Sequence, residues 1–239
     1  MMMLNPTDYL KYGYTIDNNI VKDSNGQAIY QNMGSYYNGT SGCQPATVAS
    51  GADFTCTSID FTSTGLKNDS TRNAIESVVW NLGGTGNYYS ASNGLASHFY
   101  GYERGSKVYS GRATNWTGKI GLMYPSDYGY ATSGGSTTDR ATCLAKEMYH
   151  WDGSGVSDCK NNDYLYKPGY TQWTLAPTSP RGGASAYTHY VFRVYTDGIV
   201  YDNNVNDTLS VLPVAFLKSN ITISSGNGSS STPYNLKLN

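Results

Sequence analysis

The residues of this chain that could carry out acid–base catalysis are few and scattered. Only three glutamates occur, Glu76, Glu103 and Glu147, and nothing in the sequence brings two of them together. A glycosidase needs a pair of carboxyl groups flanking the scissile bond, and such a pair could still be drawn from the fourteen aspartates. Acids that are solvated or that cap loops are the simpler interpretation, so we predict no catalytic residue.

Nucleophilic catalysis has no supporting motif either. The G-x-S-x-G nucleophile elbow is absent, and the GSG at residues 153–155 lacks both its spacing and a flanking strand. We interpret His150, beside Trp151, as a structural or surface histidine. His189 lies among tyrosines near the end of the chain, where a ligand contact and a plain surface position are both open.

A calcium loop is suggested by one stretch of oxygen-bearing side chains. The D-x-N-x-N spacing is formed by Asp202, Asn204 and Asn206. An EF-hand would then require Gly at 207 and Glu at 213, where this chain has Asp207 and Pro213. Another calcium geometry stays open, with ligands from Asp202, Asn203, Asn204 and Asp207. We predict no metal and no other cofactor.

The four cysteines fall into two local pairs. We predict the disulfides Cys43–Cys56 and Cys143–Cys159, chosen by sequence proximity among the three pairings that four cysteines allow. A zinc site is the alternative, but the chain has no Cys-x-x-Cys and its three histidines show no ligand spacing. Because disulfides persist in oxidising compartments, an extracellular or cell-surface location is expected.

Residues 173–220 have the composition of a recognition surface. Short apolar pieces alternate there with Tyr, Asn, Asp, Ser, Thr and Gly, as in antibody paratopes. The whole chain has 23 Tyr against 5 Phe. Before residue 170, tyrosines that simply cover an exposed sheet are an equally good interpretation. No catalytic motif interrupts this tail (residues 173–220), which favours a role in recognition over one in catalysis.

Charge and hydropathy exclude two classes of partner. The net charge is −1 and neither half is basic, so no nucleic-acid partner is expected. No run of 18 apolar residues occurs. The first ten residues do not form a signal or transit peptide, and we expect any membrane attachment to come from an N-terminal anchor missing from this sequence.

The periodicity predicts an α+β fold. Helices are predicted at residues 70–82, with Ile75, Val78, Val79 and Leu82 on one face, and at 95–102. A buried strand is predicted at 119–124 and a short helix within 138–150. Four further strands, at residues 172–176, 190–196, 199–202 and 212–217, are predicted to build one antiparallel sheet. We expect residues 1–64 to form an irregular or β segment packed on a main domain of residues 65–239.

Several phrases resemble a family of surface proteins from gut Firmicutes. They are residues 116–132 (WTGKIGLMYPSDYGYAT), 173–177 (WTLAP), 191–194 (VFRV), 197–200 (DGIV) and 213–220 (PVAFLKSN), with 74–84 and 102–105 also similar. The resemblance covers residues 65–236. It implies a C-type-lectin-like domain, related to formylglycine-generating-enzyme-like domains, with two helices, a small twisted antiparallel sheet and disulfide-tied loops. Members often follow a prepilin-like hydrophobic helix, and many are targets of diversity-generating retroelements that scatter Asn and Tyr codons.

Two departures from that family pattern limit what the resemblance implies. The relatives usually carry Arg where this chain has Leu212. Enzymes of the related fold use a functional cysteine or a metal, whereas all four cysteines here are expected in local pairs, so we do not carry enzymatic activity over.

The sequence therefore predicts a surface-displayed adhesion or recognition protein with a diversified binding face within residues 173–220. Its partner would be an unknown protein or glycan, with pilus subunits as further partners. A structural pilin-like subunit and an enzyme of the related fold remain the alternatives. The predicted ligand contacts are Thr178, Ser179, Arg181, Ser185, Tyr187, His189, Tyr195, Tyr201, Asp202, Asn203, Asn204, Asn206 and Asp207. The predicted buried framework is Trp173, Leu175, Phe192, Val194, Val200, Pro213 and Leu217.

Overall fold

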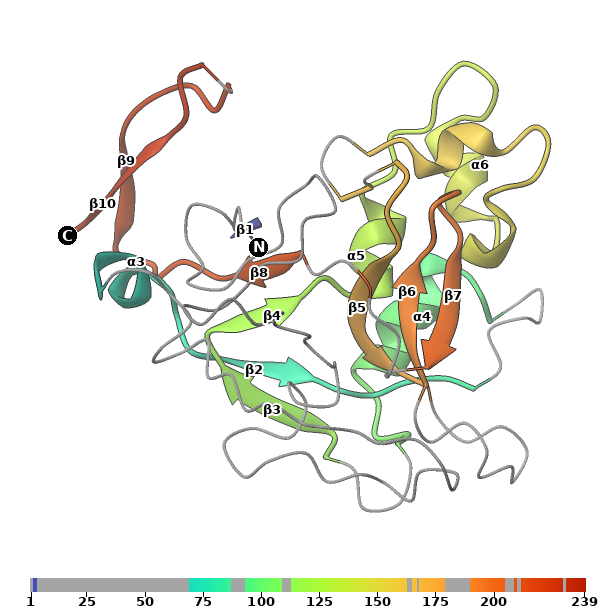
Figure 1. Cartoon of the computed structure of the whole chain (residues 1–239), viewed down its shortest axis with the longest axis horizontal. Coiled ribbons are helices and arrows are strands. Elements are labelled where there is room, and N and C mark those ends of the chain that lie inside the picture. The colour runs from blue at the N-terminus through green and yellow to red at the C-terminus, as the bar shows by residue number, and fades with distance from the viewer. Residues whose placement is uncertain are drawn as a thin grey trace, which may run out of the picture.

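Short antiparallel strands, collected in several small sheets, form most of the regular structure (Figure 1). The computed structural model describes residues 2–3, 69–86, 93–108, 113–162, 165–166, 168–178, 190–204, 209, 212–229 and 231–239. Few helices accompany the sheets, and the predicted α+β class is confirmed. In the described part of the chain, no helix is both long and apolar enough to span a membrane.

The sheet that matters most for function contains three strands in the order β5–β6–β7. These are β5 (Gln172–Pro177), β6 (Tyr190–Val194) and β7 (Val200–Asn204). The register pairs Phe192 with Asp202 and Val194 with Val200, and all four of these side chains are buried. Because successive side chains of a strand point to opposite faces, this inner face leaves the alternate residues on an outer face.

Two helices cover the inner face of that sheet (Figure 1). They are α4 (Ala96–Glu103) and α5 (Pro125–Tyr130). Phe99 of α4 meets Phe192 edge-on, with ring centroids 4.9 Å apart, and the hydroxyl of Tyr128 donates to the Gly198 carbonyl at 2.7 Å. Gly198 has φ of +93° in the turn between β6 and β7, a conformation that glycine adopts without strain.

A second sheet joins distant parts of the chain in the order β1–β8–β4. It contains β1 (Met2–Met3), β8 (Pro213–Ala215) and β4 (Ile120–Leu122). The Leu175 N–H donates to the Met123 carbonyl at 2.9 Å, so the end of β4 runs directly against β5. A separate pair, β2 (Val78–Asn81) with β3 (Asn115–Gly118), lies beside β4 (Figure 1).

The helix predicted at residues 70–82 is wrong in its second half. Helix α3 spans only Asp69–Ala74, and the chain then enters strand β2. Val79, predicted to face the core, is 62% exposed, whereas Trp80 is 1% exposed. The Val-Val-Trp run is β-branched and aromatic, which favours a strand, and pairing with β3 decides the outcome.

Most other predicted elements are confirmed. Helix α4 matches the prediction at 95–102, β4 matches 119–124, and the region 138–150 contains α6 (Arg140–Leu144) and a 3-10 turn η2 (Met148–His150). All four predicted tail strands occur, but β8 pairs with β4 and not with β7, so they do not build one sheet. The framework prediction is confirmed except at Leu217, which is only half-buried. Except for β1, the predicted N-terminal segment 1–64 lies outside the described residues.

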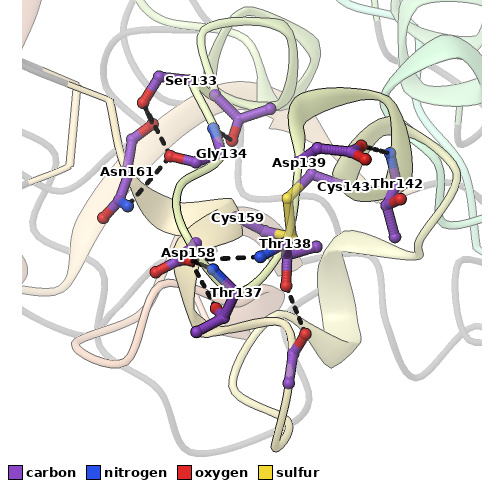
Figure 2. The surroundings of a disulfide bond; sticks show 12 residues. Ser133, Gly134, Thr137, Thr138, Asp139, Thr142, Cys143, Asp158, Cys159 and Asn161 are labelled. Atoms are coloured by element: carbon purple, nitrogen blue, oxygen red, sulfur yellow. Dashed lines mark hydrogen bonds between the residues drawn. A yellow bond between two sulfur atoms is a disulfide. The ribbon is translucent and has the colours of Figure 1, made fainter.

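The Cys143–Cys159 disulfide is confirmed and closes a loop of 16 residues (Figure 2). Around it, Asp139 caps α6 by accepting from the Thr142 N–H at 2.7 Å. Asp158 accepts from the Thr137 N–H at 2.6 Å and from its hydroxyl. Together these contacts fold the segment that carries η2 against β7. The predicted Cys43–Cys56 pair lies outside the described residues.

Removing this disulfide should cost stability. We expect the free energy of unfolding of the double variant Cys143→Ala/Cys159→Ala to be about 3 kcal/mol lower than that of the wild type. The reason is that the cross-link restricts a 16-residue loop in the unfolded chain. Urea unfolding measures the difference. The Cys43 and Cys56 positions stay unchanged, so the loss belongs to this bridge alone, and an unchanged midpoint would contradict the expectation.

The last hairpin stands apart from the rest of the molecule (Figure 1). It pairs β9 (Ile221–Ser225) with β10 (Asn235–Leu238). The pairs Leu236↔Ile223 and Leu238↔Ile221 fall on one side of the ribbon. Ile223, Leu236 and Leu238 are 58%, 42% and 45% exposed, so the hairpin adds little to the core.

Candidate functional site

The outer face of the β6–β7 pair carries polar and aromatic side chains. Arg193 lies opposite Tyr201, and Val191 lies opposite Asn203. Arg193, Tyr201 and Asn203 keep partial exposure, and Tyr195, just beyond β6, is 37% exposed. We call Tyr149, Arg193, Tyr195, Tyr201 and Asn203 the tyrosine–arginine face.

Tyr149 joins this face from the disulfide-tied segment. Its ring stacks on Tyr201, with centroids 5.4 Å apart and an angle of 28° between the planes. The exposed His150 ring meets Tyr149 edge-on at 4.9 Å. Because η2 begins only four residues after the end of α6, the Cys143–Cys159 disulfide and the Asp139 cap restrain the segment that carries the stacking partner of Tyr201.

The guanidinium of Arg193 is held by aromatic rings and not by an acid. Its central carbon lies 4.6 Å from the Tyr195 ring centroid and 5.9 Å from that of Tyr201, within reach of cation–π attraction. Between described residues, ion pairs form at Arg72–Asp69 and Arg104–Glu103. The charge of Arg193 therefore has no carboxylate beside it in the described part of the chain.

Two buried N–H donors on this side of the sheet find no hydrogen-bond acceptor among the described residues. They are Nε of Arg193 and Nε1 of Trp173, and the two residues are directly opposed in the β5–β6 register. A buried donor without an acceptor costs about 1–3 kcal/mol. Both atoms are shielded from solvent, so neither is presented directly to a ligand at the surface.

The described contact residues divide between the two faces. Tyr195, Tyr201 and Asn203 lie on the tyrosine–arginine face. Thr178 is 2% exposed, and both its N–H and its hydroxyl donate to the Tyr190 carbonyl, at 3.0 and 3.2 Å. Asp202 is 4% exposed on the inner face. Thr178 and Asp202 thus belong to the buried structure and do not form part of an exposed surface.

The other predicted contacts are Asn204 and seven residues outside the described part of the chain. Asn204 ends β7 opposite Tyr190. The remaining predictions lie outside the described residues: Ser179, Arg181, Ser185, Tyr187, His189, Asn206 and Asp207.

The open calcium geometry meets a physical obstacle in strand β7. Asp202 and Asn203 are consecutive residues of an extended strand, so their side chains point to opposite faces. They cannot both coordinate one ion from within the strand. Among the described residues, no group of three or more His, Cys, Asp or Glu side chains is placed to hold a metal.

Two members of the face were missed as contacts from the sequence. Arg193 alternates with the apolar Phe192 and Val194, which is a usable signal for an outward position. Tyr149 gives no such signal, because it lies about 50 residues before its stacking partner and in an irregular segment.

Among the described residues, the most deeply buried carboxyl group lies outside this face and has a structural environment. Glu103 is fully buried at the end of α4, where it accepts from the Ser126 N–H at 2.9 Å and pairs with the Ser126 hydroxyl. Asp127 accepts from the Tyr124 N–H at 2.9 Å. Burial raises the pKa of both carboxyl groups. Both therefore serve the N-terminus of α5, whose free N–H groups require acceptors.

The face thus combines stacked tyrosines, an amide and an arginine without an acid partner, on two strands and a disulfide-tied turn. Such an arrangement can bind a ligand. Comparison of the chain with protein-family models, with curated proteins and with solved structures found no match in any of the three.

Proposed function

We propose that this protein is a ligand-recognition module whose binding surface includes the tyrosine–arginine face. The observation that carries the proposal is an outward cluster in which Tyr195 and Tyr201 flank Arg193 and Tyr149 stacks on Tyr201. The opposite face of the β6–β7 pair is buried at Phe192, Val194, Val200 and Asp202. Tyrosine provides rigid contact area at low entropic cost, and Tyr and Arg are frequent hot-spot residues of interfaces.

We further propose the finer identity that the sequence resemblance implies. The fold would be C-type-lectin-like, and the module would be displayed outside the cell for adhesion or recognition of a protein or glycan. The order of two helices followed by the β5–β6–β7 sheet, with a disulfide-tied segment between them, is compatible with that proposal. Diversification would act within residues 173–220.

Substitution of the stacked tyrosines should weaken binding. We expect Tyr201→Ala and Tyr149→Ala each to reduce the affinity for a captured ligand by about tenfold or more, because truncation of a central aromatic residue typically has effects of this size. Ligands are first captured by the wild-type protein on printed glycan and peptide arrays. Their dissociation constants are then measured with each variant.

The matched control is Tyr234→Ala, since Tyr234 is 52% exposed on the separate C-terminal hairpin. This control should bind as the wild type does. If both Tyr149 and Tyr201 variants retained every captured ligand at wild-type affinity, the proposed binding face would be refuted.

A structural pilin-like subunit is the second candidate, and the β9–β10 hairpin is the observation that favours it. Both edges of an isolated two-stranded ribbon can accept another strand, and its apolar side chains are exposed. Sedimentation of the chain with and without residues 221–239 would separate assembly from ligand recognition.

A further inference from the structure

We propose that Arg193 is the anchor of the binding face and that it receives a carboxylate from an acidic side chain of a protein partner. This inference rests on the proposed recognition function and names the chemistry of its partner. It follows from the position of the guanidinium, from its missing acceptors and from the residues around it.

The guanidinium is already positioned before any partner arrives. Strand β6 fixes the backbone through its register with β7, and the rings of Tyr195 and Tyr201 lie 4.6 and 5.9 Å from the guanidinium carbon. Aromatic faces attract a cation without neutralising its charge. A ligand that binds here therefore does not have to order a flexible side chain first, which is a major cost of association.

Other arginines in the described part of the chain have acceptors. Arg72 pairs with Asp69, Arg104 pairs with Glu103 at 3.4 Å, and Arg140 donates to the Tyr130 carbonyl at 2.9 Å. Arg193 differs because the described residues supply it with no acceptor. Its Nε, like that of Arg72, is shielded from solvent. Of the four arginines in the described part of the chain, Arg193 alone has no internal acceptor there, and it lies on the tyrosine–arginine face.

A carboxylate is the group that fits this arrangement best. The guanidinium is a planar fork of five N–H donors that matches the two oxygens of a carboxylate. The shielded donor and the aromatic neighbours lower local hydration, which strengthens a charged hydrogen bond. Among carboxylate sources, an acidic protein side chain is favoured because clustered Tyr and Arg residues are characteristic of protein–protein hot spots.

The experiment is selection of a phage-displayed random peptide library against the wild-type chain and against Arg193→Gln. We expect the wild type to enrich peptides with Asp or Glu at a fixed position, and the variant to lose that preference. For a purified enriched peptide, Arg193→Gln should weaken binding about 10- to 100-fold. Replacement of the peptide's acid by its amide should weaken wild-type binding to a similar extent, and the two changes together should cost less than the sum.

Arg193→Lys distinguishes the effect of the positive charge from that of the planar guanidinium geometry. Lysine keeps the positive charge but lacks the fork, so we expect its affinity to fall between those of the wild type and Arg193→Gln. Should Arg193→Gln fail to fold in urea controls, the peptide amide and Arg193→Lys still test the contact.

The outcomes separate this inference from the recognition function beneath it. Neutral peptides that depend on Tyr201 but not on Arg193 would overturn the carboxylate anchor and leave recognition intact. Arg193-dependent binding of sialylated but not neutral glycans on an array would overturn the protein source. Failure of the peptide library and the glycan array alike to yield a ligand that depends on Tyr149, Tyr201 or Arg193 would overturn both proposals.

Discussion

Replacement of Gly84 by alanine is expected to be among the most damaging small changes in this protein. A Cβ atom at Gly84 would overlap the Pro177 carbonyl oxygen and lie 2.9 Å from the Pro177 carbonyl carbon. Pro177 is the last residue of β5. Its backbone cannot shift away from the added Cβ atom without disturbing the hydrogen bonds that β5 forms with β6 and with Met123. We expect Gly84→Ala to lose about 3 kcal/mol of unfolding free energy.

Thermal unfolding provides the measurement. For a chain of this length the loss corresponds to a melting temperature lower by about 10 °C. Gly101→Ala is the matched control, since Gly101 lies inside α4 and a Cβ there meets nothing within 4 Å. That control should gain about 0.5–1 kcal/mol from the better helix propensity of alanine. Equal stability of Gly84→Ala and the wild type would contradict the expectation, because it would show that the backbone at the end of β5 can shift at little cost.

The Gly83-Gly84 pair also illustrates what sequence patterns can and cannot predict. Directly after a helical pattern, such a pair is typical of the end of a helix. Its actual surroundings are the end of α4 and the end of β5, since the Gly83 N–H donates to the Glu103 carbonyl and the Gly84 N–H to the Lys107 carbonyl. Ile75, Val78, Val79 and Leu82 fit a helical face, but the same run contains a short β-strand pattern. Only the partner strand β3, more than thirty residues later, decides between them.

Local signals were reliable where the neighbours are close in sequence. Helix α4, the tail strands and the Cys143–Cys159 bridge all depend on short spacings, and each was predicted correctly. Non-local choices were not predictable in this way. Strand β8 resembles the tail strands before it, yet it pairs with β4, some ninety residues earlier in the chain.

The candidate site follows the same division. Alternation along β6 and β7 distinguishes Tyr201 and Asn203 from the buried Phe192 and Val194. Composition alone also selected Asp202 and Thr178, because it cannot tell which face of a strand or bulge a polar residue occupies. Tyr149 completes the face only through a disulfide-tied turn whose contact with β7 has no counterpart in the sequence pattern.

The buried Glu103 should make the stability of this protein depend on pH. Burial raises the pKa of its carboxyl group from 4.5 to about 7, against the opposing hydrogen bonds from Ser126 and the charge of Arg104. A raised folded-state pKa in an acid means that the folded protein retains its proton longer than the unfolded chain. The contribution of Glu103 to the free energy of unfolding is therefore fully present below pH 4.5. It declines between pH 4.5 and 7, by on the order of 3 kcal/mol.

Glu103→Gln tests this dependence because the amide mimics the protonated acid. Its oxygen can accept from the Ser126 N–H and its NH₂ can donate to the Ser126 hydroxyl, in place of the carboxyl proton. Urea unfolding should therefore give equal stability for variant and wild type at pH 4, and a variant more stable by about 3 kcal/mol at pH 8. A difference that does not change with pH would contradict the assignment.

Asp158→Asn supplies the control of opposite sign. Hydrogen bonds from Thr137 lower the pKa of the Asp158 carboxyl group below 3.8, so its charge stabilises the fold above that pH and the benefit is lost only in stronger acid. This variant should be less stable than the wild type at pH 8, and the gap should close as the pH falls below 3.8. Opposite responses of the two variants would locate the stability lost at neutral pH in the Glu103 carboxylate. The contact between α4 and α5 would then be more stable at pH 4, where Glu103 is protonated, than at pH 8, where a buried carboxylate destabilises it.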